Sequence, residues 1–489
     1  MTVAKDIKIL LVEDAKSMRK IEVKILRSIG FENILEANDG VEAVEIIEST
    51  DGIDLVISDW NMPNMSGYEL LVAIRQNEQY QDVPFIMATA QADKEQAQKA
   101  ESAGCSGFIP KPFSAGELKD QIEMVFGEEQ TEPEDAEAAG PQKSASGKVK
   151  LRVAHIQITD HLILGVLKSW IEQGEIVPKH FELETQCMAG WNPVEQALEK
   201  GDVDAAFVLA PIAMDLFHFG TPIKMVLLAH RNGSIFVRNK QGDYLAPYED
   251  FFKKKSVLIP HKMSVHHMLT HMFFNPINVK PSLDKDDDVD INLEVVAPIN
   301  MTPFMKENSE VGGFVVAEPM GSKSVASGVS EKLFLSSEIW PNHPCCVVTV
   351  RDDFSEPHSE AVQEFVECLV KAGKFVAEEG AMAAFAAVRF LDPDKKLDLK
   401  IQVLKKVLTD PLGITTDNLF PVKADIDKMQ RYMHDNMGVG HLIDMDAFVD
   451  TQYAEKACPD FNPDKYSAEL LNTEEVITSI LSRSTGDSE

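Results

Sequence analysis

The first 127 residues repeat one pattern five times: a short apolar run and then a stretch with helical periodicity. The apolar runs are "IKILLVE", "NILEA", "DLVIS", "PFIMAT" and "GFIP". Met18, Ile21, Ile25 and Ile29 mark one helical face after the first run, and "GVEAVEIIE", "GYELLVAIRQ", "KEQAQKAESAG" and "AGELKDQIEMVF" follow the others. Strands that alternate with helices form a parallel sheet covered on both faces. Residues 1–127 are therefore predicted to form a five-stranded, doubly wound α/β domain.

Residues 128–147, "EEQTEPEDAEAAGPQKSASG", contain no aromatic residue and no aliphatic residue larger than alanine. Such a segment cannot offset the entropy cost of its own ordering, so we expect a flexible acidic linker. From residue 148 strands and helices alternate again. We expect residues 148–489 to form a second α/β domain with two lobes and a helical C-terminal extension.

One helix of this second domain has clear end signals in the sequence. In "NPVEQALEKG", Asn192 is a favoured N-cap residue, Pro193 suits the first helical position, and Gly201 suits the position after the last turn. The sequence thus predicts a helix between Asn192 and Gly201.

Charge and cysteine content narrow the functional classes. The chain has 489 residues and a formal net charge of −32, which repels nucleic acids and anionic membranes. No apolar stretch approaches the roughly 20 residues that span a bilayer, and the N-terminus lacks the pattern of a signal peptide. Six scattered cysteines do not form a disulfide framework. We expect a cytoplasmic protein that binds neither nucleic acid nor membrane.

Five polar residues follow the predicted strands of the first domain, and the carboxyl ends of parallel strands meet at one edge. They are Glu13, Asp14, Asp59, Thr89 and Lys111. Clustered carboxylates suit Mg²⁺, and an amine with a hydroxyl suits a tetrahedral anion. A single aspartate at a strand end is more often a helix cap. Five such groups favour phosphoryl transfer to Asp59 as the nucleophile.

The stretches "LLVEDAKSMRKI", "ISDWNMPNMSGYELL", "IMATAQAD" and "GFIPKPF" resemble the receiver domain of two-component response regulators, in particular chemotaxis regulators, over residues 5–127. The resemblance implies that a histidine kinase phosphorylates Asp59. It also implies that Glu13, Asp14, Asp59 and the backbone carbonyl of Asn61 hold Mg²⁺, and that Thr89 and Lys111 contact the phosphoryl group. In the family, the proline that corresponds to Pro112 is cis.

The resemblance departs from the family at the switch aromatic, which is often tyrosine and is Phe108 here. Rotation of this ring can still couple to Thr89, but no hydroxyl is available for a partner. Simple core packing is an equally good interpretation of Phe108 from residue type alone.

Several stretches of the second domain are similar to solute-binding proteins of nitrate, bicarbonate and sulfonate ABC importers, over residues 149 to about 440. Examples are "LRVAHIQITDHLILGVL", "VGGFVVAEPMGSKSV" and "SSEIWPNHPCCVVTVRDDF". That family has two lobes joined by a hinge and works outside the cytoplasm. Behind a receiver domain and without an export signal, it implies ligand sensing rather than transport.

Ligand-binding candidates in this domain lie at strand ends and at a predicted helix start. They are Thr159, Asp160, His161, Trp191, Pro211, Ser234, Ser264 and Glu318. Helix capping is an alternative role for Thr159 and Asp160, and surface packing is an alternative for Trp191. Nitrate-binding relatives carry a lysine in the segment that reads "IWPNHP" here. Pro341 occupies its place, which argues against nitrate itself.

Three other patterns carry little functional signal, and two of them suggest metals only weakly. The acidic run from Asp284 resembles a calcium loop but lacks the turn glycine and the closing glutamate, so a solvated loop is favoured. His267 and His271 are four residues apart without an evident third ligand. Cys345 and Cys346 lie in an apolar run, and buried packing is the favoured interpretation.

These features favour a signalling protein that is not an enzyme beyond its own phosphoryl transfer and dephosphorylation. A histidine kinase, a small-molecule ligand such as a small anion or related nutrient, and a downstream signalling protein are the expected partners. The alternative is an enzyme or ligand-dependent scaffold related to thiamine-pyrimidine synthesis proteins, with a regulatory receiver domain.

Overall fold

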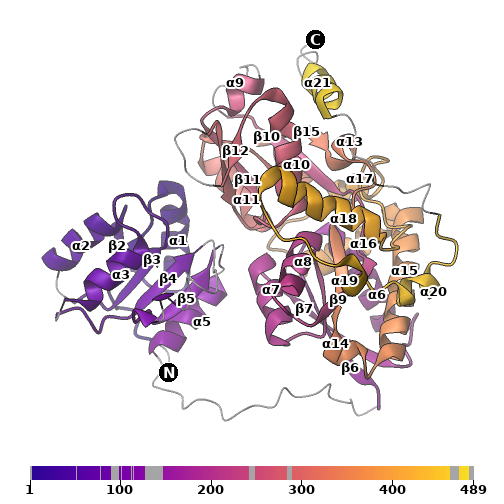
Figure 1. The fold of residues 1–489 in the computed structure, drawn as a ribbon, viewed down its shortest axis with the longest axis horizontal. Helices are drawn as coiled ribbons and strands as arrows, with labels where there is room; N and C mark the ends of the chain where they lie inside the picture. The colour runs from indigo at the N-terminus through magenta and orange to yellow at the C-terminus, as the bar shows by residue number, and fades with distance from the viewer. Residues whose placement is uncertain are drawn as a thin grey trace. The chain divides into compact units, whose positions relative to one another are not determined.

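The computed structural model describes residues 3–50, 52–77, 79–89, 99–100, 102–111, 113, 115–126, 147–241, 248–283, 289–462, 468 and 473–483. The chain forms two compact units, residues 1–136 and 137–489, which are described separately (Figure 1). The predicted linker, apart from Gly147, lies outside the described residues. In the part of the chain that is described, no helix combines the length and apolar character needed to cross a bilayer.

The first unit contains a five-stranded parallel sheet in the order β2-β1-β3-β4-β5. Its strands are β1 (Ile9–Val12), β2 (Ile34–Ala37), β3 (Leu55–Asp59), β4 (Phe85–Thr89) and β5 (Gly107–Pro110). The helices that the structure describes in full are α1 (Lys16–Ser28), α2 (Gly40–Ser49), α3 (Gly67–Arg75) and α5 (Ala115–Phe126). The predicted doubly wound fold is confirmed. Most of the predicted helix "KEQAQKAESAG" lies outside the described residues.

Alternate residues of each strand face opposite sides of this sheet, as the period of a β-strand requires. Leu10 and Val56 contribute to a core on one face that α2 and α3 complete. Leu11 and Ile57 contribute to a core on the other face that α1 and α5 complete. Because both faces are buried, the strands are apolar throughout rather than alternating.

The buried face of α1 differs from the predicted one. Ile21, Ile25 and Ile29 are only partly buried, whereas Glu22 and Leu26 are almost fully buried. The stripe of isoleucines therefore lies at the edge of the helix's contact with the sheet. An acidic side chain occupies its centre, and this requires a buried partner.

The second unit contains two sheets, which define two lobes. The first lobe has the order β7-β6-β8-β16-β9 and the second has the order β12-β13-β11-β14-β10-β15. The first sheet consists of β6 (Val149–His155), β7 (Phe181–Cys187), β8 (Ala205–Leu209), β9 (Ile223–Leu228) and β16 (Cys346–Arg351). The second consists of β10 (Ser234–Asn239), β11 (Lys255–Ile259), β12 (Pro281–Ser282), β13 (Ile291–Val295), β14 (Val311–Ala317) and β15 (Ser330–Leu335).

The chain passes between the lobes twice. It leaves the first sheet after β9 and enters the second at β10, and it returns after β15 to form β16. β16 lies antiparallel between β8 and β9, and β10 lies antiparallel between β14 and β15. The second lobe is therefore an insertion within the first, and residues 229–233 and 336–345 are the two connecting segments.

Helices surround both sheets (Figure 1). Those that follow strands within the lobes are η1 (Thr159–His161), α6 (Leu162–Glu172), α7 (Trp191–Lys200), α8 (Ala210–His218), α9 (Tyr248–Phe252), α10 (Val265–Phe274), η2 (Asn275–Ile277), α11 (Pro298–Glu307), α12 (Met320–Ala326) and α13 (Ser336–Ile339). The C-terminal extension consists of α14 (Asp352–Ser355), α15 (Ser359–Glu378), α16 (Gly380–Leu391), α17 (Ile401–Leu408), α18 (Lys423–Arg431), η3 (Tyr432–Asn436), α19 (Met445–Phe448), α20 (Gln452–Ala457) and α21 (Thr473–Arg483).

The start of α7 differs from the prediction by two residues. Gly190 precedes the helix, Trp191 is its first residue, and Asn192 does not cap it. Pro193 is tolerated at the third position because the first backbone N–H groups of a helix have no partner within it. Gly201 ends the helix with φ 78°, as predicted, because this left-handed conformation favours glycine.

Arg231 joins the first connecting segment to the C-terminal extension. Its guanidinium is fully buried, donates to the carbonyl of Asn342 at 2.8 Å, and lies 3.2 Å from the carboxylate of Asp425 in α18. Its backbone also exchanges two hydrogen bonds with Thr415. Since a buried charge is stable only when it is paired, this arginine ties the helical extension to the connection between lobes.

We expect Arg231→Met to destabilise the second unit by ~3–5 kcal/mol, because Asp425 and the carbonyls of Asn342 and Phe420 lose this cation. The control is Lys423→Met, which breaks an exposed pair with Asp446 at 2.7 Å and should cost ~0–1 kcal/mol. Urea unfolding followed by tryptophan fluorescence measures both. Equal losses of stability in the two variants would contradict a special role for Arg231.

Candidate functional site

The sheet of the first unit presents Asp59 at the carboxyl end of β3, beside the start of α3. Gly67 packs so closely here that a Cβ atom would lie 2.0 Å from the carbonyl oxygen of Asp59. Ser66 caps α3 and forms a capping box with Glu69. The backbone N–H of Trp60 donates to the Asp59 carboxylate at 2.9 Å. Close packing and local hydrogen bonds together hold this carboxylate at the sheet edge.

Three carboxylates meet at that edge, as the sequence predicted. Oxygen atoms of Glu13, Asp14 and Asp59 all lie within 4.8 Å of one another. Glu13 is buried, while Asp14 and Asp59 are partly exposed. Oxygen ligands alone, with partial access to solvent, fit a hard cation such as Mg²⁺. Asn61 lies two residues beyond β3 and is exposed.

Lys111 follows β5 and lies buried among carboxylates. Its amine forms an ion pair with Glu13, lies 3.1 Å from Glu22, and lies 3.5 Å from Asp59. Burial opposes the charge on Lys111, but the carboxylates outweigh it and raise the pKa of the amine well above its usual range. The lysine therefore carries a positive charge next to the carboxylate of Asp59.

Burial also acts on the acids around Lys111. It raises the pKa of Glu13 to about 7, although the nearby lysine lowers it. Burial likewise raises the pKa of Glu22. Sequence reasoning missed Glu22, because the isoleucine stripe of α1 indicated a different buried face. The signal that could have identified it is an acidic residue between the apolar residues Ile21 and Val23.

The remaining receiver candidates lie on the neighbouring strands. Thr89 is the last residue of β4, whose neighbour on one side is β3, and Phe108 lies in β5. The Phe108 ring is partly buried and contacts the core that includes Ala100 and Ala103. Pro112 lies outside the described residues. The roles of Thr89 and Phe108 remain predictions.

In the second unit, two candidates connect the lobes. Thr159, in η1 of the first lobe, donates its hydroxyl to the carbonyl of Glu318 at 2.7 Å and its N–H to the same oxygen at 2.8 Å. Glu318 follows β14 of the second lobe, and its carboxylate accepts hydrogen bonds from Ser322. Burial raises the pKa of Glu318 to about 7. Both residues therefore have structural partners at the junction of the lobes.

Ser234 and Ser264 are also buried and engaged. The Ser234 hydroxyl lies 3.0 Å from His266. Ser264 is the N-cap of α10, as its position predicted: its hydroxyl accepts from the N–H of His267 at 3.1 Å and donates to the carbonyl of His261 at 2.6 Å. A ligand could reach either hydroxyl only as an additional partner. Pro211 is a buried residue of α8.

Trp191 and His161 are buried neighbours rather than surface groups. Their rings are 5.6 Å apart in an edge-on arrangement, and the exposed fraction of Trp191 is 2%. The Trp191 indole N–H and the Nε2 atom of His161 have no hydrogen-bond partner among the described residues. Burial lowers the pKa of His161 well below its usual range, so this ring is neutral.

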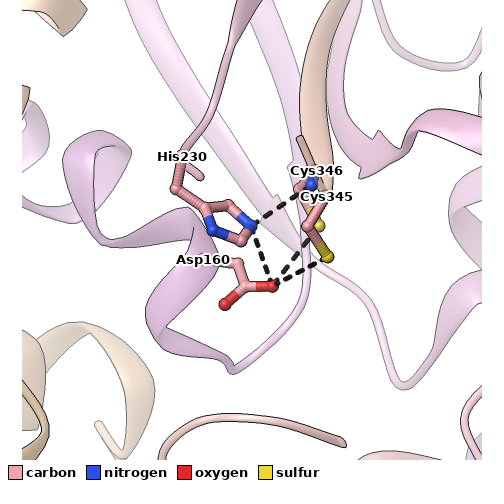
Figure 2. Close-up of side chains that lie close together, drawn as sticks. All are labelled: Asp160, His230, Cys345 and Cys346. Carbon is pink, nitrogen blue, oxygen red and sulfur yellow. Dashed lines mark hydrogen bonds and ion pairs between the residues drawn. The ribbon is translucent and has the colours of Figure 1, made fainter. Parts of the chain in front are cut away.

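Asp160 is the centre of a cluster that the sequence did not predict (Figure 2). One of its carboxylate oxygens, Oδ2, lies 3.0 Å from Nε2 of His230, 3.8 Å from Sγ of Cys345 and 3.6 Å from Sγ of Cys346. All four side chains are fully buried. Burial lowers the pKa of a histidine, but Asp160 outweighs it and raises the pKa of His230 to about 10.

Cys345 and Cys346 are buried, as expected, but they do not contact apolar groups alone, because both thiols approach the Asp160 carboxylate. His230, His266, His343 and Trp340 were missed altogether. His230 and Cys345 come from the two segments that connect the lobes, so only the tertiary fold brings them together. The one sequence signal for this cluster was His230, a histidine that directly follows an apolar run.

Among the described residues, His267 and His271 do not belong to a cluster of metal-ligating side chains. Nδ1 of His267 lies 2.9 Å from the carbonyl oxygen of Lys262, and Nδ1 of His271 lies 2.9 Å from the Tyr432 hydroxyl. The acidic residues 284–288 lie outside the described residues. Pro341 is partly buried between α13 and β16.

Comparisons with known proteins agree with this division of the chain. Residues 9–123 match the model of the response regulator receiver domain, and residues 144–389 match that of the NMT1-like family. Chemotaxis protein CheY-3 of Vibrio cholerae is 43% identical over 122 residues, which cover 25% of this chain and 93% of that protein. Chemotaxis protein CheY of Pseudomonas aeruginosa is 43% identical over 119 residues, which cover 24% and 95%.

Solved structures show the same fold for the second unit. The ligand-binding component of an ABC-type import system from Staphylococcus aureus, solved with zinc bound, has a TM-score of 0.54 at 20% identity and covers 63% of this chain and 98% of that one. The periplasmic nitrate-binding protein NrtA from Synechocystis has a TM-score of 0.53 at 15% identity and covers 68% and 97%. The chain thus belongs to the NMT1-like family, with a response regulator receiver domain of the chemotaxis type at its N-terminal end.

Proposed function

We propose that this protein is a two-component response regulator in which a histidine kinase phosphorylates Asp59 and the second unit senses a small molecule. The observation that carries the first half is the convergence of Asp59, Glu13, Asp14 and Lys111 at one sheet edge. The receiver-domain match and the chemotaxis relatives support it. The net charge of −32 favours protein and small-molecule partners in a cytoplasmic setting over nucleic acid or membrane.

The phosphoryl transfer follows from the local charges. A carboxylate oxygen of Asp59 attacks phosphorus, the bond to the kinase histidine breaks, and an acyl phosphate forms. A bound Mg²⁺ supplies neutralisation of the phosphoryl oxygens, with Glu13, Asp14, Asp59 and the carbonyl of Asn61 as its proposed protein ligands. Lys111 stabilises the added negative charge, because its amine already lies 3.5 Å from Asp59.

Thr89 and Phe108 are proposed to transmit this change. Thr89 ends the strand beside β3, and Phe108 contacts the core next to Ala100 and Ala103. Contact of the threonine with the phosphoryl group would free space for the Phe108 ring to move inward. The surface near Ala103 would then differ between the two states and could be recognised by a downstream signalling protein.

Two buried hydrogen-bond donors in the second unit lack partners within the described part of the chain, and they support the proposal that this unit senses a small molecule. The indole N–H groups of Trp191 and Trp340 have no partner among the described residues, and an indole N–H can only donate. The ligand should therefore present acceptor atoms, as a small anion or related nutrient does. Thr159 and Glu318 meet at this junction, and Thr159, Asp160, Ser234, Ser264 and Glu318 are proposed to complete the site with Trp191.

Asp59→Asn should abolish acyl phosphate formation, because the amide cannot act as the nucleophile. Incubation of the full-length chain with acetyl phosphate and Mg²⁺, followed by mass spectrometry, should add one phosphoryl group to the wild type and none to the variant. Asp54→Asn, at the start of the same strand, is the matched control and should label normally. Equal labelling of Asp59→Asn would refute the assignment.

Glu22→Gln should speed phosphorylation of Asp59. Glu22 lies 3.1 Å from Lys111 and competes for its charge, so its neutral isostere leaves more of that charge to the phosphoryl group. An increase on the order of tenfold is equivalent to ~1.4 kcal/mol of relieved repulsion. Glu36→Gln, which alters the partly exposed partner of Arg19, is the control. If Glu22→Gln is phosphorylated at the wild-type rate, Glu22 does not compete with the phosphoryl group for the charge of Lys111, and the prediction is wrong.

A thermal-shift screen of the full-length chain tests sensing, because a ligand that binds only the folded state raises its melting temperature. Nitrate, bicarbonate, sulfonates, pyrimidines and amino acids are the compounds to test, and a saturating ligand at 100 times its Kd stabilises by ~2.7 kcal/mol. Trp191→Phe should reduce the shift, and Trp170→Phe, which alters a ring beside Phe375, should not. The absence of a shift with every compound would count against sensing of these classes.

A further inference from the structure

We infer that Asp160, His230, Cys345 and Cys346 form a binding site for a divalent transition metal of the zinc class (Figure 2). This inference goes beyond the proposed function, because it depends neither on phosphorylation of Asp59 nor on the identity of the small molecule. It rests on the geometry of the four donors, on their complete burial, and on contacts that the protein alone does not satisfy.

The donor atoms already have the spacing of a metal's ligands. Oδ2 of Asp160 lies 3.0 Å from His230 Nε2, 3.8 Å from Cys345 Sγ and 3.6 Å from Cys346 Sγ. One donor from each of the four residues lies within 4.8 Å of all the others. Tetrahedral ligands at the usual Zn–O, Zn–N and Zn–S bond lengths are separated by about 3.2–3.8 Å. The side chains therefore need little rearrangement.

The cluster is poorly explained as a structural ion pair. Nε2 of His230 faces a carboxylate oxygen, which requires a proton on that nitrogen. The same atom lies 3.2 Å from the backbone N–H of Cys346, which requires a lone pair on it. One protonation state cannot satisfy both neighbours. A cation between Nε2 and Oδ2 would replace that proton and neutralise the carboxylate, and the N–H of Cys346 would then take another acceptor.

Other polar atoms of the cluster are also left unsatisfied. Asp160 Oδ1 and His230 Nδ1 have no hydrogen-bond partner among the described residues, although both side chains are fully buried. The thiols are weak donors, and their distances of 3.6 and 3.8 Å to Asp160 are long. A metal bound to Oδ2, Nε2 and the two sulfurs would replace these long thiol contacts, and it would satisfy Oδ1 only if Asp160 binds through both oxygens.

The donor set selects the class of metal. One imidazole nitrogen, two sulfurs and one carboxylate oxygen suit Zn²⁺ and similar divalent transition metals, whereas Mg²⁺ and Ca²⁺ prefer oxygen alone. Binding would release the proton shared by His230 and Asp160 together with the thiol protons, and no electrons are transferred. The oxygen cluster of the first unit differs in this respect and should not compete for the same metal.

The position of the cluster gives the metal a mechanical role. His230 lies in the first connecting segment and Cys345 in the second, while Asp160 lies beside Thr159, which binds Glu318 of the other lobe. A bound ion would join both connecting segments to the first lobe. Because all four ligand side chains are buried, the ion can enter only when the lobes separate, so exchange should be slow.

Cobalt(II) substitution of the reduced, full-length chain tests the site, because Co²⁺ reports thiolate ligands through a near-ultraviolet charge-transfer band. The chain should first be stripped with a chelator under a non-thiol reductant. We expect a slow rise of this band to one equivalent, together with tetrahedral visible bands, and loss of both when Zn²⁺ is added. A wild-type chain without a charge-transfer band would overturn the inference.

Two variants locate the site. The double variant Cys345→Ser, Cys346→Ser should lose the band and weaken zinc binding by on the order of 100-fold or more. Cys368→Ser, which changes a buried thiol in α15, should retain both. His230→Gln keeps the thiols, so an altered cobalt spectrum there supports the site even if the double variant folds poorly. Retention of the wild-type spectrum in either cluster variant would refute the assignment.

Discussion

The positive charge of one buried lysine stabilises the acidic edge of the sheet in the first unit. Lys111 lies among Glu13, Glu22 and Asp59, and its charge lowers the pKa values of Glu13 and Glu22 against the larger opposite effect of burial. The lysine thus makes the acidic edge compatible with a folded sheet before any metal or phosphoryl group arrives. Asp59 is the most exposed of the three acids, so the carboxylate proposed to be phosphorylated is also the one most accessible to solvent.

The second unit meets a similar constraint in a different way. Its first connecting segment contains two buried basic residues, Arg231 and His230, at adjacent positions. Arg231 is paired with Asp425 of the C-terminal extension, and His230 is paired with Asp160 of the first lobe. Each carboxylate comes from a different part of the unit. The position of this segment therefore depends on both parts at once. A movement of either part would shift the connection between the lobes.

Local sequence patterns predicted the first unit well because its structure is mostly local. Each apolar run became a strand, and the helix predicted for "AGELKDQIEMVF" begins and ends at the predicted residues. The patterns failed where two residue types competed. The isoleucines of α1 concealed Glu22, and the favourable capping chemistry of Asn192 was overridden because Trp191 is buried as the first residue of α7.

The buried cluster of the second unit could not be predicted, for a topological reason. Asp160, His230 and Cys345 are separated by 70 and 115 residues in sequence and belong to no local motif. They meet only because the chain leaves one sheet and later returns to it. Strand ends in a parallel sheet can be anticipated from alternation alone, whereas a contact between two crossing segments requires the full path of the chain.

That path also determines the order in which the second unit can be assembled. β16 lies between β8 and β9, so the sheet of the first lobe has a gap between these two strands until residues 346–351 have been synthesised. The second lobe, from β10 to β15, is complete before that point. A nascent chain therefore carries a finished inserted lobe beside an unfinished one, with β8 and β9 each lacking a partner edge. Synthesis is vectorial and unpaired strand edges aggregate, so this interval is when the chain most needs protection on the ribosome.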